Sequence, residues 1–201
     1  MGILKDLTKE YFGEKVRKED EIDIFGLEVD IVSFTDKNGK KHKKGYKPKS
    51  WYNLDKLLER MIEVRGDEGD FNDIDTSEIE DMSFLFLNKT TFNGDISGWD
   101  VSNVKNMKSM FDNAASFNQD ISKWEFPEVT DMSKMFWCAK SFNQDISKWK
   151  FPKVTDMEGM FWCAESFNQN LSEWDLTRIN TKFIFFLCPI KNEFKPKMKK
   201  E

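Results

Sequence analysis

The chain has 201 residues, a formal net charge of -5, 39% hydrophobic residues and 14% aromatic residues. This composition is that of a globular protein with ample material for a core, and no run approaches the roughly 18 apolar residues that a membrane-spanning helix needs. The acidic balance argues against a general nucleic-acid-binding protein, because sequence-independent affinity for phosphate requires a basic surface. The lysine-rich stretches at 37–49 and 195–200 are expected to be solvated loop and tail.

Residues 1–50 show no repeat and are predicted to form a helix followed by a β-hairpin. Leu4, Leu7, Tyr11 and Phe12 fall at helical spacing, and residues 22–34 are typical of a strand that leads into an Asn-Gly turn and a returning strand. The first residues lack the apolar run of a secretory signal. The sequence as written therefore predicts a cytoplasmic protein.

Residues 51–70 are predicted to carry a capping helix. Asn53 is expected to be its N-cap and Gly66 its end. One face of this helix is apolar, with Leu54, Leu57, Leu58, Met61 and Ile62 at helical spacing. The open end of a stack of repeats would bury such a face, because terminal repeats expose apolar surface.

Residues 71–190 repeat every 25 residues without interruption, which predicts a solenoid of about five coils. An Asn or Asp that precedes apolar residues at helical spacing predicts a short helix in each coil. Alternation of apolar and polar residues around each Trp predicts a short strand. We therefore expect an α/β repeat solenoid, leucine-rich-repeat-like, with an N-terminal α/β cap and a basic tail at 191–201. The repeated positions include Trp99, Trp124, Trp149 and Trp174.

The repeat motif resembles that of a known family. FNQDISKW at 117–124, followed by VTDMSKMFWCAKSF at 129–142, is similar to the repeat of the BspA-like leucine-rich repeat surface proteins, including the mycoplasma-lipoprotein-associated type. The lead-in FNDIDTSEIEDMSFLF at 71–86 resembles the first repeat of such proteins, and the likeness covers about residues 47–190. It implies a right-handed parallel solenoid with a role in adhesion or protein recognition, and a location at the cell surface or outside the cell.

The three cysteines also follow the period. Cys138, Cys163 and Cys188 are 25 residues apart, and earlier repeats hold Asn88 and Asn113 at the same position. Such a row is expected to satisfy backbone groups at a bend. A metal or redox site would need the thiolates to converge with a His or a fourth Cys, and the sequence has one His. The odd cysteine count without a CxxC pair suits a reducing compartment.

Asp95, Asp120 and Asp145 form a second row, which Asn170 continues. Three carboxylates on neighbouring coils could hold a hard cation such as calcium. The alternative is that each side chain bonds backbone amides of its own turn, as Asn170 could do without a charge. We expect the second arrangement and predict no metal site.

The tryptophan row has two interpretations. Exposed indoles would form a platform for sugars, as in an adhesive or carbohydrate-binding surface protein. Buried indoles would belong to the core. We favour the core for two reasons. Phe126 and Phe151 lie two residues after a Trp, and therefore on the same side of the predicted strand, and Ile74 replaces Trp in the first repeat.

No catalytic residues or cofactor-binding motif can be identified, because a glycine-rich phosphate loop and a His that could pair with Ser or Cys are both absent. The sequence predicts a non-catalytic module that binds a protein partner; it specifies neither the partner nor the oligomeric state. The candidate partner-binding face is formed by the solvent-exposed positions on either side of the tryptophans, and its charges give a basic centre between acidic ends. Its residues are Lys123, Glu125, Lys148, Lys150, Glu173 and Asp175.

Overall fold

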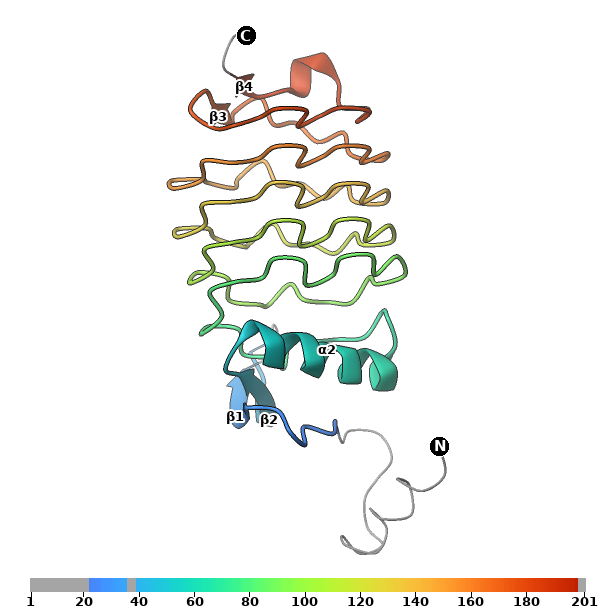
Figure 1. Ribbon diagram of the computed structural model, residues 1–201, viewed down its shortest axis with the longest axis vertical. Coiled ribbons are helices and arrows are strands. Elements are labelled where there is room, and N and C mark those ends of the chain that lie inside the picture. Colours follow the sequence, from blue (N-terminus) through green and yellow to red (C-terminus); the bar gives the residue numbers. More distant parts are fainter. Residues whose placement is uncertain (1–21, 36–38, 199–201) are drawn as a thin grey trace, which may run out of the picture.

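The computed structural model describes residues 22–35 and 39–198 (Figure 1). Its first elements are the strands β1 (Val29–Thr35) and β2 (Lys41–Pro48), which pair antiparallel. The predicted hairpin is confirmed, although its first strand begins at Val29. The helix predicted near the start of the chain lies outside the described residues. Near the end of β2, the Tyr46 amide donates to the carbonyl of Asp73 at 2.8 Å, which joins the hairpin to the first repeat.

Helix α2 (Trp51–Arg65) follows the hairpin and begins three residues earlier than the predicted N-cap would place it. Its N-cap is Ser50, whose hydroxyl accepts from the amide of Asn53 at 3.3 Å, so Asn53 is not the N-cap. Serine caps as well as asparagine does, and the earlier start brings Trp51 into the helix. The predicted end is confirmed, since the amide of Gly66 donates to Ile62 at 2.8 Å and its φ is 79°.

α2 covers one end of the stack of repeats, next to the hairpin (Figure 1). The apolar face predicted for it is confirmed by Leu54, Leu57, Leu58 and Met61, which are fully buried in the same core as the repeats. The Trp51 indole donates to the carbonyl of Ser83 at 2.9 Å. The helix therefore supplies the apolar cover that the first repeat needs.

The repeats lie one upon another as coils, and Figure 1 shows this stack from green to red. Within it, each coil donates backbone hydrogen bonds to the next coil from alternate residues, as when Met107, Ser109 and Phe111 donate to Asp131, Ser133 and Met135 at 2.9 Å. We call the strips that pair in this way the turn segments, and the surface that they form the turn face. The turn segments are residues 81–88, 106–113, 131–138, 156–163 and 180–187.

The short helix predicted in each coil is wrong. Among the described residues no helix lies between α2 and the three-residue helix η1 (Asn192–Phe194). The turn segments are successive β-turns with left-handed residues at every fourth position, such as Lys134 and Cys138 with φ of 57° and 51°. Their amides therefore point to the next coil instead of closing helical turns. The Asx side chain keeps a capping role, because Asp131 accepts from the amide of Ser133 at 2.8 Å.

The strand predicted around each tryptophan is present only in the last coil, as β3 (Asp175–Leu176), which pairs in parallel with β4 (Lys197–Met198). In the earlier coils this segment bends, and the amide of Trp124 donates to Ile121 at 3.1 Å. The predicted alternation of burial is nevertheless confirmed, because Trp124 and Phe126 are buried while Lys123 and Glu125 are exposed. The right-handed, leucine-rich-repeat-like class of solenoid stays a prediction.

Two columns of phenylalanine rings run through the core along the stack. In each column neighbouring rings are nearly parallel, with centroids 5.2–5.6 Å apart in the first and 6.0–6.2 Å apart in the second. Each of the first four coils thus contributes one ring to each column, the last contributes Phe185 to the first column alone, and each coil is stabilised mainly by its neighbours. The first column contains Phe86, Phe111, Phe136, Phe161 and Phe185, and the second Phe92, Phe117, Phe142 and Phe167.

The last coil is one residue shorter than predicted. Asp156 pairs with Asn180, which lies 24 residues later, and the amide of Cys163 donates to Phe186. Leu187, with φ of 56°, therefore takes the place of Cys163, and Cys188 takes the place of Ala164. The predicted uninterrupted 25-residue period is therefore wrong for the last coil. The predicted row of three cysteines is also wrong, because Leu187 and not Cys188 follows Cys163 in the row.

Residues 191–198, which we predicted as part of a basic tail, lie on the last coil. The carbonyl of Phe194 accepts from the amide of Leu171 at 2.8 Å, and the amide of Lys197 donates to Trp174 at 3.1 Å. Ile190 and Pro196 are buried there. The segment is held because it satisfies backbone groups that the last coil would otherwise leave unpaired.

Candidate interaction surfaces

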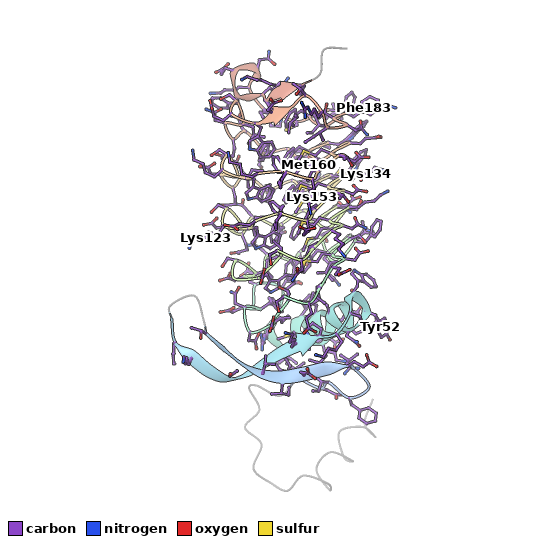
Figure 2. The ribbon with its side chains drawn as sticks, turned by 90° about the vertical axis from the view of Figure 1, so that its left-hand side faces the viewer. Tyr52, Lys123, Lys134, Lys153, Met160 and Phe183 are labelled. Carbon is purple, nitrogen blue, oxygen red and sulfur yellow. The ribbon has the colours of Figure 1, made fainter. Side chains whose placement is uncertain are left out.

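The six residues predicted to bind a partner all lie on one surface, which we call the tryptophan face. This face is formed by residues 95–101, 120–126, 145–151 and 170–176. In Figure 2 it is found at the left-hand edge of the stack, where Lys123 is labelled. All six predicted side chains are exposed. Neighbouring coils hold equivalent residues about 4.8 Å apart, as in a parallel sheet. The structure therefore brings Lys123, Glu125, Lys148, Lys150, Glu173 and Asp175 together.

The lysines of this face differ from others on the stack. Within residues 22–35 and 39–198, no ion pair involves Lys123, Lys148 or Lys150. By contrast, Lys105 pairs with Glu80 at 2.8 Å and Lys153 with Glu128 at 2.6 Å. The lysines at the centre of the tryptophan face thus lack a close ion-pair partner among the described residues, although Lys123 and Lys148 help to lower the pKa of Asp120 and Asp145.

The four tryptophans beneath this face are buried, each at most 4% exposed. Three indoles donate to carbonyls of the preceding coil, such as Trp149 to Ile121 at 3.2 Å. The Nε1 of Trp124 is buried without a hydrogen-bond partner. The core interpretation is confirmed, and a sugar-binding platform formed by these indoles is wrong, because their faces are covered.

The aspartate row bonds its own turns. Asp120 accepts from the amide of Ser122 at 3.0 Å, and Asn170 accepts in the same way from Ser172 at 3.0 Å. Hydrogen bonds from Ser122 hold the pKa of Asp120 below its ordinary value. The turn interpretation is confirmed. Across the described residues, no three His, Cys, Asp or Glu side chains are grouped so that they could hold a metal ion.

A row of asparagines, which recurs in the sequence after Phe92, Phe117, Phe142 and Phe167, links the coils beside this surface. The Oδ1 of Asn118 accepts from the amide of Asn143 at 2.9 Å and from the side chain of Gln144 at 3.0 Å. The same bonds join Asn143 to Asn168 and Gln169. The repeated Phe-Asn-Gln-Asp motif predicts a turn rich in side chains that bond the backbone, and the structure adds that these bonds join neighbouring coils.

Cys138 and Cys163 lie at the ends of two turn segments, Cys188 directly follows the last one, and all three are free thiols. Cys138 and Cys163 are stacked neighbours, whereas Cys188 is offset toward the core. Burial and the neighbouring Cys163 thiol raise the pKa of Cys138 to about 11. Burial likewise raises the pKa of Cys188 to about 11. Cys138 and Cys188 are therefore poor nucleophiles near neutral pH.

The turn face carries a second row of aromatic side chains, which the sequence analysis missed. We call it the outer ladder. The indoles of Trp137 and Trp162 stack with centroids 4.4 Å apart, and Trp162 contacts Phe183 and Phe186 at 5.4 and 4.3 Å. Leu187 follows, so the ladder contains Trp137, Trp162, Phe183, Phe186 and Leu187. Figure 2 shows Phe183 at the edge of the stack opposite Lys123.

These features define a protein of stacked repeats, with a helical cap at one end and two separate surfaces along the stack. A family model described as "Mycoplasma protein of unknown function, DUF285" matches residues 53–174, which is more than half of the chain, and the protein belongs to this family. The match begins inside α2, so the unit that it defines includes most of the capping helix. Searches of curated proteins and of solved structures gave no match. No helix in the described parts of the chain has the length and apolar character needed to cross a membrane.

Proposed function

We propose that the protein is a non-catalytic recognition module of the BspA-like leucine-rich repeat type, which binds a protein partner through its tryptophan face. The observation that carries this proposal is the contrast within that face between Trp and its neighbours. The tryptophans are buried and nearly invariant from coil to coil, whereas the exposed positions beside them change from Lys123 and Glu125 to Lys148 and Lys150 and then to Glu173 and Asp175.

A surface of this kind supports selective binding. Stacking constrains the core positions to repeat, while the exposed positions are free to match a partner. Charged groups on such a surface give register and selectivity more than raw affinity. The basic centre is chemically available because its three lysines lack ion pairs among the described residues.

The experiment compares two variants with the same net charge. The first is Lys123→Gln, Lys148→Gln and Lys150→Gln; the control is Lys56→Gln, Lys105→Gln and Lys153→Gln, at lysines that have ion pairs away from this face. The proteins captured from the source cell by the wild type would be identified, and their binding measured at several salt concentrations. We expect the first variant to lose binding at least tenfold, with a weaker salt dependence, and the control to retain it. Equal binding by both variants would exclude the tryptophan face as the binding site.

A further inference from the structure

The outer ladder contains apolar residues that are exposed to solvent and whose backbone has the left-handed conformation that such residues disfavour. Leu187 is 66% exposed and has a left-handed backbone with φ of 56°. The equivalent position in the first two coils is held by Asn88 and Asn113, the residue type that tolerates this conformation best after glycine. An exposed leucine at a strained position indicates a contact outside the chain.

Phe183 has the same combination of features. It is 48% exposed and has φ of 58°, at a position where the earlier coils carry Phe84, Ser109, Lys134 and Gly159. Phe186 beside it is 46% exposed. Exposed large apolar side chains therefore lie at both ends of the turn face, with Phe84 and Leu87 in the first coil and the larger group, Phe183, Phe186 and Leu187, in the last.

The outer ladder is confined to the last three coils. The position of Trp137 and Trp162 is occupied by Asp112 in the second coil, which interrupts the row before Leu87 in the first. Aromatic stacking that served the stability of the whole stack would have no reason to stop there. This restriction favours a local binding site, where half-buried Trp and exposed Phe act as anchors.

The charges around the ladder indicate what its partner carries. The ammonium group of Lys134 lies 5.1 Å from the Trp137 ring, and that of Lys182 lies 5.1 Å from the Phe183 ring. Among the described residues neither lysine forms an ion pair. The nearby Glu158 accepts from the side chain of Asn180 at 3.4 Å. A partner that carries carboxylates beside apolar side chains would complement both the unpaired lysines and the apolar ladder.

The geometry favours a protein over a lipid surface. Trp137 and Trp162 cover each other's faces with an interplanar angle of 10°, so edges rather than whole rings are presented. Insertion into a membrane requires side chains that project about 5–10 Å into the headgroup boundary. Coils repeat about every 4.8 Å, and residues three or four apart on a helix advance about 4.5–6 Å. A helix that lies along the stack would therefore place one apolar side chain at each coil.

We propose that the outer ladder is the docking site for an acidic amphipathic helix of a partner protein. The apolar side chains of the helix, at i, i+3 or i+4, and i+7, pack on Trp137, Trp162 and Phe186 in successive coils. Carboxylates on the flanks of the helix pair with Lys134 and Lys182. This site is on the opposite side of the stack from the tryptophan face and does not depend on the function proposed for that face.

The test uses a display library of 15-residue peptides on a helical alanine scaffold with randomised positions, selected on the full chain. Enriched peptides are synthesised, and their Kd is measured by fluorescence polarisation. The test variant is Phe183→Ser with Leu187→Asn, residues that the same positions hold in other coils. The control is Phe84→Ser, which removes an equally exposed ring with φ of 62° outside the ladder.

We expect enriched peptides to carry apolar residues at helical spacing with flanking Asp or Glu. Their Kd should rise at least tenfold for the test variant and also for Lys134→Gln with Lys182→Gln, but remain unchanged for Phe84→Ser. Leu187→Asn alone should weaken binding while the thermal midpoint stays equal or rises, which a purely structural role would not produce.

Three results would overturn the proposal. The first is that no peptide is enriched, and the second is that enriched peptides bind the test variant as well as the wild type. The third is that vesicles of phosphatidylcholine and phosphatidylglycerol sediment the wild type but not the test variant, which would assign the ladder to lipid. Lys123→Gln, Lys148→Gln and Lys150→Gln should leave peptide binding unchanged, so failure of one surface is distinguishable from failure of the other.

Discussion

The indole of Trp137 lies directly against Gly159 of the next coil. A Cβ at Gly159 would stand 2.8 and 2.9 Å from two carbons of that ring, and φ of Gly159 is 61°. Gly159→Ala therefore adds a steric clash to an unfavourable backbone conformation, and we expect it to lower the free energy of unfolding by about 1–3 kcal/mol. Urea denaturation would measure the loss.

A second background separates the two contributions. The first two coils hold Leu87 and Ser109 at the positions of Trp137 and Gly159. In a Trp137→Leu protein the clash is absent, so Gly159→Ala should cost only the backbone term of about 1 kcal/mol. Equal losses in the two backgrounds would show that the indole does not select glycine at this position.

Trp124 and Trp149 occupy the same place in neighbouring coils but differ in one hydrogen bond. The Nε1 of Trp149 donates to Ile121 at 3.2 Å, whereas that of Trp124 is buried without a partner. Substitution by Phe removes the same volume at both sites. We expect Trp124→Phe to be less destabilising than Trp149→Phe by about 1 kcal/mol, since only the second loses a hydrogen bond. Denaturation of both variants under one set of conditions gives the comparison, and the reverse order would contradict it.

The asparagine row predicts a sharp difference between two substitutions of Asn143. Its Oδ1 accepts from the amide of Asn168 at 3.0 Å and from the side chain of Gln169 at 2.9 Å. Asn143→Ala leaves the Asn168 amide unpaired, while the Gln169 side chain keeps its bond to the Asn143 carbonyl at 2.8 Å, and the change should cost about 1–3 kcal/mol. Asn143→Asp keeps the acceptor and should cost less. Ser141→Ala, at an exposed position nearby, should change the free energy of unfolding by less than about 0.5 kcal/mol.

The sequence predicted what depends on periodicity. The residues that stack and the buried tryptophans follow from the positions that recur every 25 residues. The apolar face of α2 follows from the positions that fall on one side of a helix. The helix predicted in each coil was wrong because apolar residues at i, i+3, i+4 and i+7, such as Met132, Met135, Phe136 and Ala139, are buried equally well by successive β-turns. Burial spacing alone does not show where the backbone amides point.

The candidate sites divide in the same way. The tryptophan face was predictable because exposed positions alternate with buried ones. The outer ladder was not, since Trp137 and Trp162 directly follow buried phenylalanines in an apparent helical pattern. The shorter last coil was hidden because Phe185 and Phe186 are adjacent, so either ring could continue the period. The Asn180-Thr181 pair, which replaces Asp156-Met157, was the signal of the 24-residue step.

Cys188 can be used to test the 24-residue step between the last two turn segments, because that step decides whether Cys188 follows Ala164 or Cys163 in the stack. Cys188 stands where Ala114, Ala139 and Ala164 stand in the preceding coils, and burial raises its pKa to about 11 from 9.0. A raised thiol pKa means that the folded protein retains a proton that the unfolded chain loses. The resulting stabilisation is complete below about pH 9 and declines as the pH rises toward 11.

We therefore expect Cys188→Ala to change the free energy of unfolding at pH 7 by less than about 1 kcal/mol, because alanine is the residue that this position holds elsewhere. The variant should also lose less stability than the wild type between pH 9 and 11. A thiol reagent at pH 8 should label Cys138 and Cys188 slowly in the folded wild type, and all three cysteines rapidly in denaturant. Labelling of Cys188 at the same rate in the folded and unfolded states would place it on the surface with Cys163, and would restore the uninterrupted 25-residue register.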